Sequence, residues 1–345
     1  MRSHDQEAYR KSRHCRGNWL RRRCRCATLC EQAQGQEEWT PPAGPHSFGR
    51  KSRNRLRSLV TGEVEMSPHS GVLAAFAAVL AMPAAVSAQE AADIEMWRLD
   101  CGTLELSDTG PFSDTHLYDG QPRRLTDSCY LIRNGTRYLL WDTGLSGALK
   151  GTRETRGVFT SSVDRTIVEQ LGDLGLAPED VAMVGISHYH NDHIGQAADF
   201  PHAELLIGAG DAEAVIANGR EETIAQLAPW FGADADGKVT RIAGDHDVFG
   251  DGTVRMIATH GHTPGHKALV VELPRMGTYM LTGDLYHFEE QIENEGVPTF
   301  NTDRADTLAS FHRFNQMADS LDATVVVQHE PRHIERLPAF PESAN

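Results

Sequence analysis

The segment Ser187–Gly195 reads SHYHNDHIG and is the densest group of potential metal-ligand side chains in this sequence. It holds four of them within six residues, namely His188, His190, Asp192 and His193. Imidazole nitrogens and carboxylate oxygens are ligands that zinc prefers, and four of them this close can hold two ions. A surface histidine tract is the alternative, but the apolar run at 181–186 leads straight into the motif and indicates a strand. The spacing therefore predicts a dinuclear zinc site.

The first 88 residues differ from the rest of the chain. Residues 1–65 carry 14 Lys or Arg and 7 Asp or Glu with almost no apolar periodicity, which is typical of disordered sequence. A zinc knuckle in this stretch is the less favoured interpretation, because the four cysteines are irregularly spaced: Cys15, Cys24, Cys26 and Cys30. Residues 66–88 contain Met66, a short uncharged apolar run and small residues at Val86 and Ala88, as in a secretory signal peptide.

This organisation predicts export to the periplasm or the outside of the cell. We expect translation to begin at Met66, so that residues 1–65 are an over-long gene prediction. The apolar stretch is short for a membrane span, and we expect none in the mature protein. The mature hydrolase domain would then comprise residues 89–345.

Residues 89–345 are strongly acidic. The whole chain has 33 basic and 48 acidic side chains, of which 19 and 41 fall in this part, giving a net charge of −22. Such a charge repels phosphate backbones, so we expect a small neutral substrate and no nucleic-acid partner. Only Cys101 and Cys129 remain here, and their spacing leaves a disulfide open. Homodimer formation is also left open.

Apolar periodicity predicts the elements that must position the ligands. Two strands, 129–132 and 138–141, flank the turn dipeptide Asn134-Gly135. A helix capped near Ser161 or Ser162 should follow, and a longer one should span 303–321 and bury Leu308, Phe311 and Leu321. Further strands are expected at 181–186, 203–207, 253–258, 268–273, 278–281 and 324–327. Because each candidate ligand follows the end of such a strand, the ligands should converge on one edge of a sheet sandwich.

Four motifs together resemble those of the metallo-β-lactamase superfamily, in the family's order. They are HxHxDH at 188–193, GHTPGH at 261–266, TGD at 282–284 and QHE at 328–330. The resemblance covers about residues 125–330, includes the turn Asp142-Thr-Gly144, and implies an α/β fold with four αββα layers. It also implies that one zinc ion is held by His188, His190 and His262, the second by Asp192, His193 and His329, and that Asp284 bridges them.

The bridging position separates the branches of this superfamily. Zinc β-lactamases have cysteine or serine there, whereas lactonases and thioesterases have aspartate. Asp284 and the absence of cysteine after Cys129 therefore argue against a β-lactamase. The exported context and GDLYH at 283–287 resemble the secreted N-acyl homoserine lactonases. That resemblance implies that a hydroxide shared by two zinc ions, oriented by Asp192, attacks the lactone carbonyl to give an acyl homoserine.

The roles of several neighbouring side chains stay open. The best-known lactonases have a catalytic tyrosine three residues after the bridging aspartate, where this chain has His287. Either His287 or the preceding Tyr286 should therefore donate a hydrogen bond to the oxyanion. Asp142 is either a turn former or an acceptor for the second ring N–H of a ligating histidine. We expect His260 and His266 to pack or brace the site rather than to bind metal.

Other interpretations rest on residues farther along the chain. Trp230 and Phe231 are expected in the core or a dimer contact rather than in a groove for an acyl chain. A glyoxalase II-like thioesterase is the main enzymatic alternative, with Arg332 and Arg336 gripping glutathione carboxylates, but the signal peptide and acidic charge argue against it. Another lactonase or esterase substrate is a nearer alternative. The complete ligand set argues against a zinc-binding protein without turnover.

Overall fold

The computed structural model describes residues 93–345 of the chain. The expected basic extension at 1–65 and the expected signal peptide at 66–88 lie outside the described residues, as do the cysteines of the disfavoured zinc knuckle. Among the described residues, no helix combines the length and apolar character needed to span a membrane.

The first sheet has eight strands in the order β4-β5-β1-β2-β3-β6-β7-β8. Their bounds are Ile94–Leu106 for β1, Arg123–Asn134 for β2, Arg137–Trp141 for β3, Glu154–Arg156 for β4, Phe159–Ser162 for β5, Val181–Gly185 for β6, Glu204–Gly208 for β7 and Val239–Ile242 for β8. The predicted hairpin is confirmed, because β2 and β3 pair antiparallel around Gly135, whose φ is +60°. Strands β3, β6, β7 and β8 then run parallel.

The second sheet has five strands in the order β13-β12-β11-β10-β9. Their bounds are His246–Asp247 for β9, Val254–Ala258 for β10, Lys267–Leu273 for β11, Gly277–Leu281 for β12 and Thr324–Val326 for β13. All neighbours pair antiparallel except β12 and β13, which are parallel. Each strand predicted from the sequence is present, and most ends differ by at most one residue. The exception is β2, which begins at Arg123, six residues before the predicted start, and ends two residues after the predicted end.

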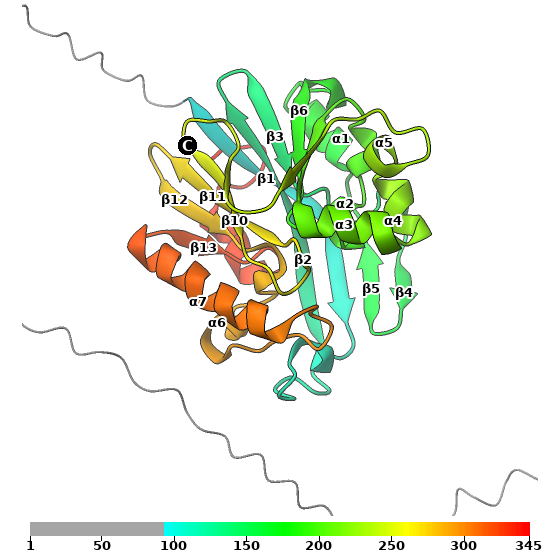
Figure 1. Cartoon of the computed structure of the whole chain (residues 1–345), viewed down its shortest axis with the longest axis vertical. Helices are drawn as coiled ribbons and strands as arrows, with labels where there is room; N and C mark the ends of the chain where they lie inside the picture. Colours follow the sequence, from blue (N-terminus) through cyan, green and yellow to red (C-terminus); the bar gives the residue numbers. More distant parts are fainter. Residues whose placement is uncertain (1–92) are drawn as a thin grey trace, which may run out of the picture. The chain divides into compact units, whose positions relative to one another are not determined.

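Helices cover the outer faces of both sheets (Figure 1). Their bounds are Ile167–Asp173 for α1, Asn191–Ile194 for α2, Ala209–Asn218 for α3, Glu221–Gln226 for α4, Ala228–Phe231 for α5, Glu290–Asn294 for α6 and Arg304–Ser320 for α7. One apolar cluster lies between the sheets and contains Tyr130, Trp141 and Leu269. Two others lie under the helices, one below α1 to α5 and one below α7. The predicted αββα sandwich is confirmed.

Two helices differ in detail from the prediction. Ser161 and Ser162 belong to strand β5, which pairs with β1, so neither of them caps a helix. The helix begins after Thr166, whose hydroxyl accepts from the Glu169 N–H while the Glu169 carboxylate accepts from the Thr166 N–H. This reciprocal capping fixes the start of α1. The long helix α7 has nearly the predicted bounds and buries Phe311 fully, whereas Leu308 and Leu321 are only half-buried.

A disulfide joins Cys101 to Cys129, a pairing that the sequence left open. It links β1 to β2 with a Cα–Cα distance of 5.9 Å, and both cysteines are fully buried. The turn after β3 packs on it, because Leu145 donates its N–H to the Cys101 carbonyl and a Cβ on Gly144 would lie 2.3 Å from the Cys101 Cβ. Only glycine fits at position 144, where φ is also +62°.

Candidate metal centre

The ligand-type side chains leave the C-terminal ends of strands from both sheets. Strand β6 leads to His188 and His190, and α2 adds Asp192 and His193. The loop after β10 carries His262. Asp284 follows β12 in a short 3-10 turn, and His329 follows β13. The structure thus brings the candidate ligands together at one edge of the sandwich, as expected from the sequence.

Seven side chains form two neighbouring groups. The first contains His188, His190, His262 and Asp284, and the second contains Asp192, His193 and His329, with ligand atoms in each group within 4.8 Å of one another. Asp284 reaches both groups, since its Oδ2 lies 3.2 Å from His262 Nε2 and its Oδ1 lies 2.9 Å from His329 Nε2. These are the seven residues that the sequence singled out, arranged so that one carboxylate can bridge two ions.

Hydrogen bonds on the outer side of the rings fix the tautomers of three histidines. Each donates its Nδ1–H to an oxygen that can only accept, and so leaves a lone pair on Nε2 facing the centre. The donor and acceptor pairs are His193 to Asp142 Oδ2 at 3.0 Å, His262 to Asn301 Oδ1 at 2.9 Å, and His329 to the Thr126 carbonyl at 2.8 Å.

The inward-facing nitrogens fit a cation. His262 Nε2 lies 3.1 Å from His188 Nε2 and 3.0 Å from His190 Nδ1, and His329 Nε2 lies 3.3 Å from His193 Nε2. Nitrogen lone pairs this close repel unless something positive lies between them. The buried Asp284 Oδ1 also makes no hydrogen bond of good geometry. The donor set of imidazoles and carboxylates is the one that suits zinc.

The charges of the site favour bound cations. Burial lowers the pKa of His188 well below its usual range and that of His190 to about 3, so both rings are neutral ligands. Burial alone would raise the pKa of Asp284, but the surrounding histidines, with His287 contributing most, hold it well below its usual range. Burial alone would lower the pKa of His329, but the Asp284 carboxylate beside it outweighs this effect, and the pKa is raised to about 9. A positive charge at the second group, which contains Asp192, His193 and His329, is therefore stabilised. Either a proton or a metal ion can supply this charge.

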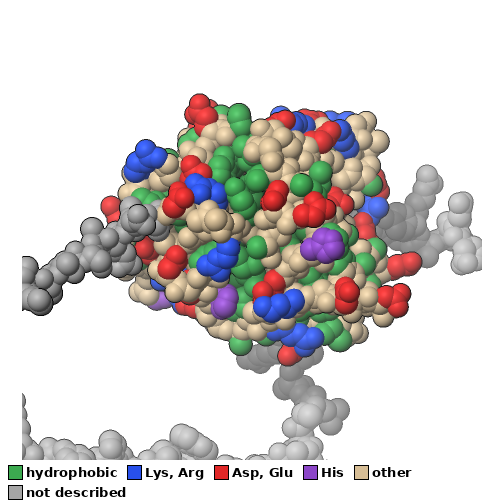
Figure 2. Space-filling model, turned by 90° about the horizontal axis from the view of Figure 1, so that it is seen from above, with side chains coloured by type: hydrophobic (Ala, Val, Ile, Leu, Met, Phe, Trp, Pro, Cys, Tyr) green, Lys and Arg blue, Asp and Glu red, His purple; other side chains and the backbone are tan. Residues whose placement is uncertain are grey.

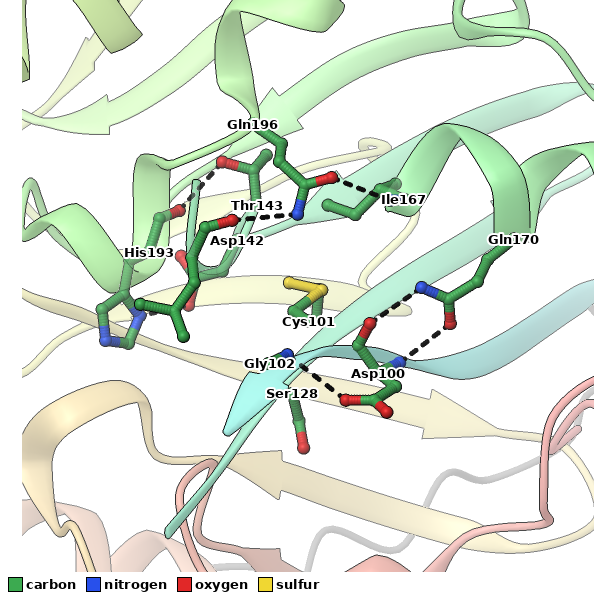
Figure 3. Close-up of a disulfide and its surroundings, with 12 residues drawn as sticks. Asp100, Cys101, Gly102, Ser128, Asp142, Thr143, Ile167, Gln170, His193 and Gln196 are labelled. Atoms are coloured by element: carbon green, nitrogen blue, oxygen red, sulfur yellow. Dashed lines mark hydrogen bonds and ion pairs between the residues drawn. A yellow bond between two sulfur atoms is a disulfide. The ribbon is translucent and has the colours of Figure 1, made fainter. Parts of the chain in front are cut away.

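Asp142 both shapes a turn and supports a ligand, so the two interpretations hold together. It has φ of +57° at the start of the turn after β3 and is fully buried. Its carboxylate accepts from His193 Nδ1, from the Ser187 N–H at 2.6 Å and from Gln328 Nε2 at 2.9 Å. The next residue, Thr143, donates its N–H and hydroxyl to the His193 carbonyl (Figure 3). The turn thus fixes both the ring and the backbone of His193.

His266 braces the site, as expected. It is fully buried, donates from Nδ1 to the Thr259 carbonyl at 3.0 Å and accepts from the Asp284 N–H at Nε2, also at 3.0 Å. It therefore holds the backbone of the bridging carboxylate and has no free lone pair for a metal. His260 is half-buried and belongs to neither ligand group.

Tyr286 cannot serve as the oxyanion donor. Its side chain is fully buried, stacks on Phe311 with ring centroids 4.5 Å apart, and donates its hydroxyl to Asn315 at 3.3 Å. His287 points the other way and lies in the site, with Nε2 3.1 Å from Asp284 Oδ2. The reason is that Tyr286 has extended dihedrals, φ −132° and ψ 139°, and successive side chains of extended backbone point to opposite sides.

Several supporting residues were not predicted from the sequence. Asn301 orients His262, Gln328 donates to Asp142, and Asp211 binds the loop that carries His262. Gln328 is part of the QHE motif and could have been noticed there. Asn301 and Asp211 lie 39 and 54 residues from their partners in the sequence and stand in no local pattern.

A cavity of about 660 Å³ opens onto the ligand groups. His190, Asp192, Asp284, His287 and His329 contribute to its lining. Its apolar lining comes from β1, β2 and β5, from the loops after β1 and β3, and from the segment before α7. These residues are Leu104, Phe112, Leu125, Leu145, Leu149, Phe159 and Phe300. Trp230 does not line it, because this residue is buried and donates from Nε1 to the Ala203 carbonyl in the core.

Comparison with known proteins supports the fold. The model of the metallo-beta-lactamase superfamily matches residues 123–329. The chain is 32% identical over 181 residues to the N-acyl homoserine lactonase AttM of Rhizobium radiobacter, covering 49% of this chain and 65%, just under two thirds, of that protein. It is 28% identical over 261 residues to AttM of Rhizobium johnstonii, covering 69% of this chain and 94% of the relative.

Comparison with solved structures supports the same fold. The structure of an N-acyl homoserine lactone hydrolase, with the product N-hexanoyl-L-homoserine bound at its catalytic metal center, superposes with a TM-score of 0.62 at 25% identity and covers 72% of this chain and 98% of its own. The dizinc quorum-quenching lactonase AidC shares the fold at 18% identity, with a TM-score of 0.52 and coverage of 73% and 90%. Since the family model spans well over half of the chain and the site carries the family's motifs, this protein belongs to the metallo-β-lactamase superfamily.

Proposed function

We propose that this protein hydrolyses the lactone ring of N-acyl homoserine lactones with two bound zinc ions. The observation that carries the proposal is the single carboxylate, Asp284, that joins two ligand groups beside a cavity with apolar walls. The similarity to proteins named N-acyl homoserine lactonases supports the choice of substrate.

The proposed zinc ligands divide as the two groups do. His188, His190 and His262 would hold the first ion, Asp192, His193 and His329 the second, and Asp284 both. Two zinc ions supply Lewis acidity, which polarises a carbonyl and lowers the pKa of water towards neutrality.

The side chains around the ligands would handle the proton and the developing charge. Asp192 is partly exposed to the cavity and is suited to accept the proton of the attacking water and to deliver it to the ring oxygen as the ester C–O bond breaks. His287 is suited to donate a hydrogen bond to the carbonyl oxygen as it becomes an oxyanion. Its Nε2, which lies 3.1 Å from Asp284 Oδ2, is the nitrogen that faces the site and would donate, whereas Nδ1 is buried. The product is an acyl homoserine with a free carboxylate and hydroxyl.

The cavity walls support an acylated substrate. Leu104, Leu149, Phe159 and Phe300 line the cavity and offer apolar contacts for an acyl chain, and Phe300 is 42% exposed. On the face seen in Figure 2, Lys and Arg side chains are scattered among acidic ones, so this face of the described chain has no basic patch for a phosphate backbone. A small neutral lactone with an apolar tail suits these surroundings.

The thioesterase alternative loses its supporting residues. Arg332 pairs with Glu289, Glu290 and Glu330, and Arg336 donates to the Val325 carbonyl and pairs with Glu289. Neither arginine lines the cavity. Both guanidinium groups are therefore engaged in the structure and are not available to grip the carboxylates of glutathione.

A direct comparison of substrates tests the proposed function. Zinc-loaded protein lacking residues 1–88 should open N-acyl homoserine lactones faster than it cleaves a glutathione thioester or a chromogenic cephalosporin. The His188→Ala variant should lose the lactonase activity, which excludes a contaminating enzyme. Hydrolysis of the cephalosporin alone would assign the chain to another branch, and zinc binding without turnover of any substrate would favour a non-catalytic protein.

Replacing His287 should affect turnover more than binding. In His287→Phe, which keeps the ring but removes both nitrogens, kcat should fall on the order of 10²–10³-fold with little change in KM, because the lost hydrogen bond forms mainly in the transition state. Steady-state kinetics with zinc content measured in parallel checks this. Tyr286→Phe is the matched control and should keep kcat within a few-fold. Equal loss in both variants would refute the role of His287.

We propose export for the mature protein. The disulfide between Cys101 and Cys129 supports this, since such bonds persist mainly in oxidising compartments. N-terminal sequencing of the protein recovered from the periplasm or medium should begin at Gln89. Recovery of an intact chain from the cytoplasm alone would refute the proposal.

A further inference from the structure

The loop that carries His262 rests on the start of helix α3. The Asp211 carboxylate accepts from the Gly265 N–H at Oδ1, at 2.6 Å, and from the Thr263 hydroxyl at Oδ2, at 2.9 Å. Both donors flank Pro264 in the segment 261–266. Asp211 is therefore bound to the residues immediately after His262 and does not touch the His262 ring.

The backbones of the loop and the helix start are in direct contact. A Cβ on Gly208 would lie 1.9 Å from the Gly265 carbonyl oxygen, and one on Gly210 would lie 2.7 Å from the Pro264 carbonyl oxygen. No side chain separates the two segments, so the hydrogen bonds of Asp211 act on a loop that has little room to shift. The opposite side of the loop is also held, because the Asp303 N–H donates to the Gly261 carbonyl at 2.9 Å.

Asp211 has no ion-pair partner among the described residues, although its side chain is fully buried. Burying a carboxylate without a directly paired counter-charge is costly. The hydrogen bonds of Asp211 and the more distant charges of His262 and Lys267 offset only part of that cost. Both oxygens of Asp211 bind the His262 loop. Burial of this carboxylate is unfavourable for folding, and proteins keep such features mainly where they serve a functional site.

We propose that Asp211 is a positioning residue for the first metal ion, acting through the backbone of the loop that presents His262. The inference rests on the proposed zinc site and deepens it. Asn301 fixes the rotation of the His262 ring. Asp211 fixes the position of the backbone from which the His262 side chain extends. The second ion has separate support, because His193 is held by Asp142 and Thr143. Removing Asp211 therefore weakens one site and spares the other.

The test measures zinc affinity at each site separately. His329→Ala removes a ligand of the second ion and leaves the first group intact, whereas His262→Ala does the reverse. Adding Asp211→Ala should lower zinc affinity about 10–100-fold in the His329→Ala background, as is typical when a group supporting a ligand is lost. It should change affinity less than about two-fold in the His262→Ala background. Competition with a chromogenic chelator gives both constants without any lactone.

Matched variants separate positioning from general destabilisation. Asp211→Asn keeps an acceptor for the Gly265 N–H and an N–H for the Thr263 hydroxyl, so it should restore most of the affinity. Glu213→Gln removes an exposed carboxylate from the same helix and should leave both affinities unchanged. In metal-free protein, Asp211→Ala should speed hydrogen exchange of the Gly265 amide by at least about ten-fold while distant β-sheet amides keep their protection.

The outcomes distinguish this inference from the proposed function. Equal weakening of both sites, unchanged affinity at the first, or no rescue by Asp211→Asn would overturn the role of Asp211. Zinc affinities that follow the expected pattern in a protein that opens no lactone would uphold Asp211 and refute the lactonase proposal. Wild-type protein that binds no zinc would overturn both.

Discussion

The Asp284→Asn variant should bind fewer than two zinc ions per chain and lose ring-opening activity almost completely. Within residues 93–345, Asp284 is the one carboxylate that contacts histidines of both ligand groups, with Oδ2 facing His262 and Oδ1 facing His329. An amide of the same size cannot offer two negatively charged oxygens to two cations. The fall in kcat/KM should exceed the 10–100-fold expected for residues that only support ligands. Elemental analysis and initial rates check both parts.

The control for Asp284 removes the same charge elsewhere. Asp319→Asn, at an exposed position on α7, should retain two zinc ions and wild-type rates. Circular dichroism of the metal-free proteins should be the same for wild type and both variants. Two tightly bound ions and near-normal activity in Asp284→Asn would show that the carboxylate does not bridge, and the dinuclear proposal would fail.

Removal of the disulfide should lower the stability of the fold substantially. Cys101 and Cys129 are 28 residues apart, and opening a loop of this length is expected to lower the free energy of unfolding by about 3–4 kcal/mol. Urea unfolding of the Cys101→Ala/Cys129→Ala double variant, at fixed zinc concentration, measures the loss. A loss below about 1 kcal/mol would contradict the prediction.

The same variant should remain active while folded. The turn that holds His193 contacts Cys101 through the Leu145 N–H and the Cys101 carbonyl, and that hydrogen bond does not depend on the sulfur. We therefore expect kcat at 25 °C within a few-fold of wild type, with a lower unfolding midpoint. Wild-type protein unfolded in urea with a reductant is the matched control and should show the same loss of stability. A large fall in kcat at full foldedness would mean that the disulfide itself positions the turn.

Local sequence predicted most of the strands, because a strand that is buried in a sheet appears in the sequence as a short run of apolar residues. The run before His188 is an example, and strand β6 ends within a residue of its predicted boundary. The boundary of α1 was missed for a local reason, since Thr166 with Glu169 is a stronger cap than Ser161 or Ser162. Strand β1 was missed as well, and its alternation of buried and exposed residues is interrupted at Met96–Trp97 and at the bulge near Cys101–Gly102.

The sequence alone determined which residue types form the site. Residue type and spacing within short motifs carry that information, because each ligand leaves the end of a strand and its neighbours in the motif follow within a turn. The seven residues named from these motifs are the ones that converge in the structure. Asp284 at the predicted bridging position also argues from sequence alone against a β-lactamase.

Tertiary structure decided which supporting side chains reach the site. Tyr286 and His287 are adjacent and chemically plausible, but extended backbone sends one into the core and the other towards Asp284. Asp211 meets its loop, and Cys101 meets Cys129, only because the chain returns to the same place after many residues. Such contacts depend on how layers pack and in which direction side chains point. Neither quantity is encoded in a short stretch of sequence.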